Sequence, residues 1–150
     1  MNQTRIKFLV TLIIRICSGT LLITGSPWLT TPLWGKHNLP FGTLITWFGI
    51  IALPLAIYLG VDQFQNPKDT LQVYLSLALK IMLAFAILWV PICFFLAGNF
   101  SFSFTEKEAF QGGQTAMQWF WRFTYGIISI PVGLLLIHWV SSILKKWMAK

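Results

Sequence analysis

Two cations, Arg15 and Lys80, lie inside apolar runs and are the first candidates for chemistry in this sequence. Arg15 interrupts the run at about 6–28, and Lys80 interrupts the run at about 71–97. A charged side chain at the centre of a bilayer costs about 2.5–3.5 kcal/mol on insertion scales. Each cation could therefore snorkel to lipid headgroups, pair with a group in this or another chain, or line an ion path. Since each lies about two to three turns from one end of its run, snorkelling is the favoured role.

The acidic residues form no recognisable catalytic set. The four carboxylates, Asp62, Asp69, Glu106 and Glu108, all fall in polar segments outside the apolar runs. A proton relay needs a titrating group at depth, so a proton pump is not expected. The sequence also lacks GxSxG, HExxH and a glycine-rich phosphate loop. We therefore predict no catalytic residues, no cofactor and no metal site.

Histidine and cysteine supply the remaining potential ligands. His37 and His138 are predicted on opposite sides of the membrane, so joint ligation of one haem is not expected. Cys17 and Cys93 lie in apolar runs, without a CxxC spacing or a histidine at metal-binding distance. The simplest interpretation is that both cysteines are small buried hydrophobic residues.

Four apolar runs must position these residues, at about 6–28, 41–60, 71–97 and 119–144. Each is near the ~20 residues that cross a ~30 Å hydrocarbon core as a helix. Helix is expected because lipid offers no partner to an unpaired backbone amide. The sequence therefore predicts an all-α membrane protein with a single domain, 1–150. Four transmembrane helices would form a compact bundle with short loops.

Local signals mark where these helices begin and end. Pro40 comes directly before the second run, where a missing amide proton is harmless. Asp69 or Thr70 can cap the start of the third run, and Gly98 ends it. The polar stretch from 99 to 118 alternates at first with a period of two, which indicates a short extended piece followed by loop or one interfacial turn.

Charge and composition favour a membrane rather than nucleic acid. Only 10% of residues are charged, against about 25% in a typical soluble domain. The net charge is +7, but the cations sit at the chain ends and in short connections, so no nucleic-acid partner is predicted. Eight cations fall on the side of the termini and three on the other, namely Lys36, Lys107 and Arg122. The positive-inside rule then predicts both termini in the cytoplasm, in a multi-pass protein of the bacterial inner membrane that contacts anionic lipid at its cytoplasmic face.

Aromatic residues and prolines add two further candidate sets. Tryptophans concentrate near the predicted outer boundary, and we take four of them as a candidate partner surface, although an aromatic belt is the simpler interpretation of any single one: Trp28, Trp34, Trp119 and Trp121. Three runs contain a mid-span proline, which frees a backbone carbonyl and can kink a helix. The candidate hinges are Pro54, Pro91 and Pro131.

Small residues recur at helical spacing in two runs. Gly126, Ser129 and Gly133 follow one face of the fourth run, and Ala52 and Ala56 follow one face of the second. Such stripes let helices approach closely. The pattern indicates helix packing but does not say whether the partner is in this chain or in another.

Three functions are compatible with these features. The preferred hypothesis is a non-catalytic accessory, assembly or structural subunit of a larger inner-membrane complex, whose partners are other membrane subunits or further copies of itself. The alternative is a small oligomeric channel or transporter for anions, with Arg15 and Lys80 along its path. The third is a membrane-embedded enzyme of lipid or quinone chemistry that uses the carboxylates of the loops.

Overall fold

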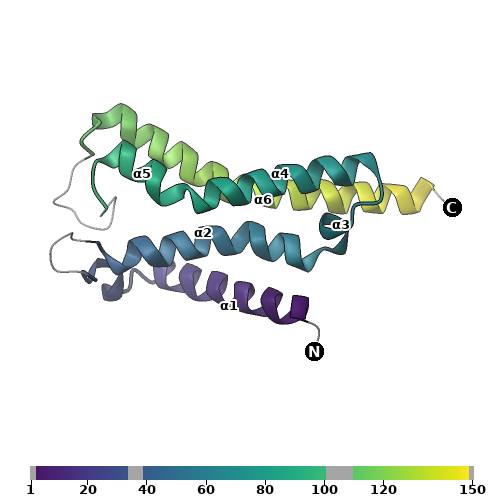
Figure 1. Ribbon diagram of the computed structural model, residues 1–150, viewed down its shortest axis with the longest axis horizontal. Helices are drawn as coiled ribbons and strands as arrows, with labels where there is room; N and C mark the ends of the chain where they lie inside the picture. The colour runs from purple at the N-terminus through teal and green to yellow at the C-terminus, as the bar shows by residue number, and fades with distance from the viewer. Residues whose placement is uncertain (1–2, 34–38, 101–109, 149–150) are drawn as a thin grey trace.

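The computed structural model describes residues 3–33, 39–100 and 110–148, and these residues are mostly helical. Four long helices dominate: α1 (Gln3–Ile23), α2 (Phe41–Gly60), α4 (Thr70–Ile87) and α6 (Gly113–Met148). Three short ones join them: the 3-10 helix η1 (Pro27–Thr30), α3 (Asp62–Gln65) and α5 (Trp89–Ala97). The helices form two hairpins that lie side by side, α1 with α2, and α4 and α5 with α6 (Figure 1).

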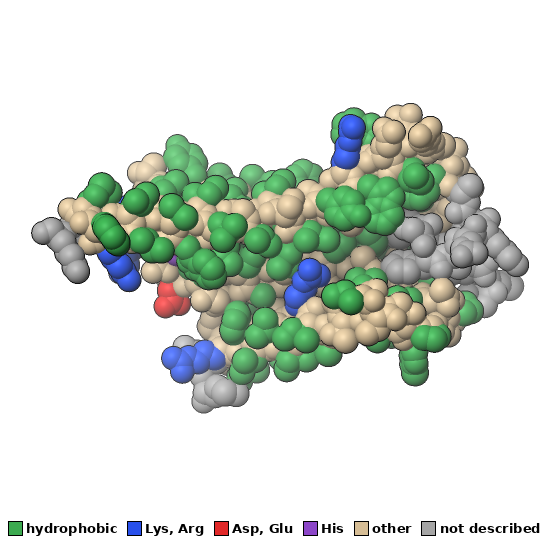
Figure 2. Space-filling model, turned by 180° about the vertical axis from the view of Figure 1, so that it is seen from behind, with side chains coloured by type: hydrophobic (Ala, Val, Ile, Leu, Met, Phe, Trp, Pro, Cys, Tyr) green, Lys and Arg blue, Asp and Glu red, His purple; other side chains and the backbone are tan. Residues whose placement is uncertain are grey.

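The four long helices are each long and apolar enough to cross a membrane. This agrees with the predicted spans and with a multi-pass membrane protein. The α1 helix begins, and the α6 helix ends, toward the same end of the molecule (Figure 1). On the face seen in Figure 2 the surface is largely hydrophobic, and the few charged side chains are scattered.

The predicted boundaries need three corrections. The first helix ends at Ile23 rather than near residue 28, because the chain turns through Gly25 at positive φ and then enters η1. The third run is two helices rather than one, since α4 ends at Ile87 and α5 begins at Trp89. The fourth helix extends from 113 to 148, beyond the predicted 119–144, because six residues of the predicted loop are helical.

The predicted helix ends are otherwise confirmed. Pro40 is the N-cap of α2. The carboxylate of Asp69 accepts a hydrogen bond of 2.9 Å from the Gln72 amide, which caps α4. Gly98 adopts a left-handed conformation after α5, with φ of 74°. The extended piece predicted after residue 99 lies mostly outside the described residues.

The α1 helix packs polar residues inward and apolar residues outward. Its two buried residues are Thr11 and Ser18, whereas Ile13 and Ile16 are each 58% exposed. The hydroxyl of Ser18 donates a hydrogen bond of 2.8 Å to the Ile45 carbonyl of α2. A surface of this kind is expected where lipid, not water, surrounds the helix.

The α2 helix lies between α1 and the other hairpin, so it has two packed faces. Gly49 faces α1, and a Cβ built on it would lie 2.1 Å from the Ser18 Oγ. On the second packed face, Ile50 joins a buried cluster with Trp89 of α5 and Phe120 of α6. A second cluster nearer the chain ends contains Phe64 of α3 and Leu79 of α4. The fold therefore has two buried clusters along the α2, α4 and α6 contacts.

Candidate functional site

Arg15 points into the α1–α2 contact. The side chain is partly buried, and its Nη1 donates a hydrogen bond of 3.5 Å to the Gly49 carbonyl. Gly49 is eleven residues, about 16 Å of helix, from Gly60 at the end of α2. The guanidinium is therefore directed at the middle of α2. This contact is the second of the three roles considered for Arg15, pairing with a group inside the fold.

Lys80 makes a different contact. Its Nζ lies 5.7 Å from the ring centroid of Tyr58, near the other end of α2, and the residue is exposed. Tyr58 and Gly49 are nine residues apart, which places them on opposite sides of a helix with 100° per residue. The structure therefore does not bring Arg15 and Lys80 together.

The third span is broken at Leu88, close to the candidate hinge Pro91. Pro91 has no amide proton, so the Ile87 carbonyl loses its helical partner. The indole Nε1 of Trp47, on α2, donates to this carbonyl at 3.0 Å and to the Ala86 carbonyl at 3.2 Å. A side chain from a neighbouring helix thus satisfies the backbone that the proline frees. The contact holds the break in one geometry.

The other two candidate hinges do not interrupt their helices. Pro54 lies within α2 and Pro131 lies within α6, and both helices continue through them. Both prolines are buried, whereas Pro91 is exposed. Among the three, Pro91 is the one that follows a break in the helix, which lies at Leu88.

The predicted outer tryptophans that the structure describes come from both hairpins. Trp28 is 67% exposed and tilts against Phe41 at the start of α2. On α6, Trp119 is 56% exposed, while Trp121 is partly buried and stacks on Tyr125 with 5.5 Å between centroids. Trp34 lies outside the described residues. The described tryptophans of this set belong to two different hairpins.

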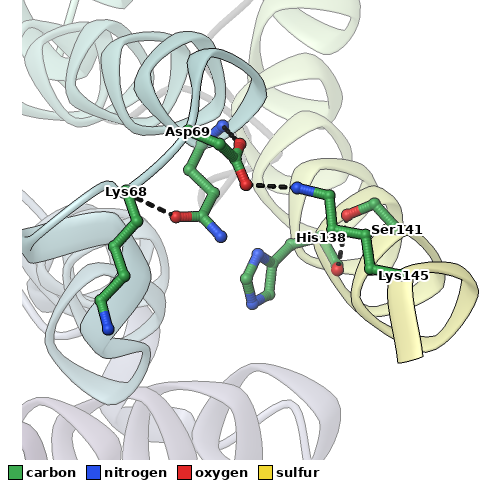
Figure 3. Close-up of polar contacts among 6 residues, drawn as sticks. Lys68, Asp69, His138, Ser141 and Lys145 are labelled. Carbon is green, nitrogen blue, oxygen red and sulfur yellow. Dashed lines mark hydrogen bonds and ion pairs between the residues drawn. The ribbon is translucent and has the colours of Figure 1, made fainter. Parts of the chain in front are cut away.

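A polar cluster joins the start of α4 to the C-terminal end of α6 (Figure 3). The Lys145 ammonium donates to the Asp69 carboxylate, which ties the end of α6 to the start of α4. The hydrogen bonds from Lys145 and from the Gln72 amide hold the pKa of Asp69 below its usual range. Gln72 also accepts from the Lys68 amide at 2.8 Å. Sequence reasoning found the cap but not the ion pair, which joins residues 76 positions apart.

His138 is buried beside this cluster. It is 5% exposed, and its ring lies 5.0 Å from the Phe64 ring of α3. Its Nδ1 has no hydrogen-bond partner among the described residues. Among the described residues, no group of three or more histidine, cysteine, aspartate or glutamate side chains could hold a metal ion. The sequence predicts His138 near the end of the fourth span. It does not indicate that Phe64 of α3 would pack against the imidazole ring.

The remaining candidates divide between packing and open surface. Cys93 is buried, as predicted, whereas Cys17 is exposed on α1, contrary to the prediction, because α1 packs only a narrow face. Ala52 and Ala56 are buried. By contrast, a Cβ built at Gly126 or Gly133 would meet nothing within 4 Å, so those glycines do not mediate close packing inside this chain.

Two grooves of similar size open on the surface. One, of about 350 Å³, lies between α4 and α6 and includes Phe85, Arg122 and Gly126. The other, also of about 350 Å³, lies between α1 and α2 and includes Cys17 and Phe48. The first contains a charged side chain and the second does not.

Comparisons of the chain with protein-family models, with curated proteins and with solved structures found no match.

Proposed function

We propose that this protein is a non-catalytic accessory, assembly or structural subunit of a larger complex in the bacterial inner membrane, with both termini in the cytoplasm. The observation that carries the proposal is Arg15, a guanidinium directed at the middle of α2. Its hydrogen bond to the Gly49 carbonyl is long, at 3.5 Å, and uses one of five N–H donors.

The acids that the structure describes cannot complete this site. Asp62 begins α3, and Asp69 begins α4 and pairs with Lys145, so both lie at the far end of α2 from Gly49. An arginine at depth in a bilayer normally pairs with another group or reaches water. An acidic side chain of a second membrane protein would supply such a partner for Arg15.

The α1 surface supports the same proposal. Its apolar side chains face outward, and the helix packs mainly on α2, so a partner helix could approach it along most of its length. The groove beside Cys17 and Phe48 lies on this side of the molecule.

Crosslinking in native membranes, followed by purification in mild detergent, tests the proposal. We expect a defined membrane protein to co-purify with the wild-type chain and to be lost from Arg15→Gln. Lys80→Gln is the matched control, because it removes a cation on the opposite side of α2 and should leave recovery unchanged. A chain that runs as a lone monomer, with no crosslinked protein, would contradict the proposal.

The orientation has its own test. Reporter fusions at residues 2 and 150 should both be active in the cytoplasm, and a fusion within 101–109 should be active outside. The reverse pattern would overturn the orientation and leave the subunit proposal standing.

The alternative, an anion channel or transporter, has no specific contact in its favour. Arg15 and Lys80 approach opposite sides of α2, so a path lined by both would need several chains. Anion flux in reconstituted vesicles that falls in both Arg15→Ala and Lys80→Ala would favour this alternative.

A further inference from the structure

The groove between α4 and α6 combines apolar walls with one positive charge. Met82 and Phe85 line it from α4, and side chains from Trp119 to Ile130 line it from α6. Gly126 lies in the middle of the α6 wall, where an added Cβ would meet nothing within 4 Å. The absence of a side chain at Gly126 therefore helps to keep the groove open.

The groove has the length of one leaflet of a membrane. Trp119 and Ile130 are eleven residues apart, which is about 16 Å along α6. Half of a ~30 Å hydrocarbon core is about 15 Å. The lining residues run from near the first turns of α6 toward the middle of the bundle, so an acyl chain of a single leaflet matches the groove in length and direction.

A cation stands at the shallow end of the groove. The Arg122 guanidinium lies 5.6 Å from the ring centroid of Trp119, one turn earlier on α6, and the residue is exposed. Asp62 and Asp69, the acids that the structure describes, lie at the opposite end of α4. Phosphate is the anion that a bilayer supplies at headgroup depth, and a guanidinium can bind it with two parallel hydrogen bonds.

We propose that this groove binds one anionic phospholipid, with an acyl chain lying over Gly126 and the phosphate on Arg122. The lipid belongs to the leaflet at the 98–113 end of the bundle. This site is separate from the contact proposed for Arg15, which lies on the other side of α2. The groove between α1 and α2 provides an internal comparison, because it has the same volume but no charged lining residue.

Native mass spectrometry in mild detergent tests the site, with phosphatidylglycerol and phosphatidylcholine of identical acyl chains as probes. Both lipids carry a phosphate, but the choline cation of phosphatidylcholine offsets its charge, whereas phosphatidylglycerol keeps a net negative charge. We therefore expect the wild-type chain to bind one phosphatidylglycerol about tenfold more tightly than phosphatidylcholine, the usual scale of a hydrogen-bonded charge. Arg122→Gln should remove this preference, and Gly126→Leu should weaken the binding of both lipids. A matched control should behave like wild type: Gly133→Leu, which changes another open glycine of α6.

Three results would overturn the proposal. Phosphatidylglycerol preference that survives Arg122→Gln would place the anionic lipid elsewhere. Lipid binding unchanged in Gly126→Leu would show that the groove is not the site. A wild-type dimer that becomes a monomer in Gly126→Leu, with lipid binding unchanged, would assign the groove to a second copy of the chain. Arg122→Gln leaves the packing around Gly126 intact, so it tests the site even where Gly126→Leu does not fold.

Discussion

The α1–α2 hairpin and the α4–α5–α6 hairpin pack their helices by different means. In the first, glycines let the backbones approach, since added Cβ atoms at Gly49 and Gly60 would lie 2.1 Å from the Ser18 Oγ and 2.8 Å from the Phe8 ring. In the second, large rings fill the space, and Phe85 meets Phe123 edge-on with 6.1 Å between centroids. Lipid removes most of the hydrophobic force between helices, so close van der Waals contact and hydrogen bonds must replace it.

This difference sets what each hairpin tolerates. The α1–α2 contact has no room for added volume at its glycines. The second hairpin, by contrast, depends on hydrogen-bond donors from tryptophan, because its helix is broken at Leu88. Substitutions that add volume should therefore destabilise the α1–α2 hairpin most. Substitutions that remove hydrogen-bond donors should destabilise the α4–α5–α6 hairpin most.

The largest effect is expected from Gly49→Val. The new side chain would overlap the Cβ of Ser18, which lies 2.7 Å from the added Cβ and cannot move without shifting α1. Overpacking of this kind costs about 3 kcal/mol. Thermal unfolding in detergent should show a clear fall in Tm, whereas Gly133→Val, in open space, should change Tm far less. Equal losses in the two variants would show that the α1–α2 contact is not close-packed.

A smaller effect is expected from Trp47→Phe. The variant removes the indole donor to the Ile87 carbonyl, and a carbonyl left unpaired in an apolar environment costs about 1–2 kcal/mol. Pro91→Ala restores an amide that can bond this carbonyl. The double variant should therefore lose less stability than the sum of the two single variants, as measured by unfolding in mixed detergent micelles. Strict additivity would mean that Trp47 does not compensate for the proline.

The smallest effect concerns the ion pair between Lys145 and Asp69, which closes the open end of the α4–α5–α6 hairpin. Asp69 has a lowered pKa, mainly because of the hydrogen bond from Lys145. The ionised Asp69 carboxylate stabilises the folded protein at pH values above the usual carboxyl pKa of about 3.9. This stabilisation is lost as the pH falls through the lowered pKa of Asp69 in the folded state. The difference in Tm between wild type and Asp69→Asn should shrink below about pH 4. A difference that stays constant to pH 2 would exclude the ion pair as its cause.

Much of the fold followed from local sequence signals. The four long helices, the Pro40 start, the Asp69 cap and the Gly98 end depend on composition and on residues close in sequence, and all were confirmed. The break in the third span was less accessible. Pro91 indicated a kink, but the sequence did not show that Trp47 of α2 would pair the carbonyl that the proline frees.

The candidate site was harder to predict because it depends on pairing between distant segments. Trp47 was one of several tryptophans near the predicted outer boundary, and only the packing of α2 on α4 shows its bond to Ile87. The covering of His138 by Phe64 requires the short helix α3, which is too brief to leave a periodic signal. Arg15 and Lys80 were identified by charge alone, and periodicity did not show that they lie on opposite sides of α2.

The unequal lengths of α2 and α6 have a consequence for membrane thickness. The 20 residues of α2 extend about 30 Å, which an average hydrocarbon core matches without tilt, whereas the 36 residues of α6 extend about 54 Å. A helix that exceeds the core tilts or carries its terminal turns into water. The last turn of α6 holds Lys145 and Lys146, which favours exit into water at that end. Thicker bilayers should therefore be accommodated on the α6 flank at little cost, while the shorter helices of the α1–α2 flank set the upper limit on bilayer thickness.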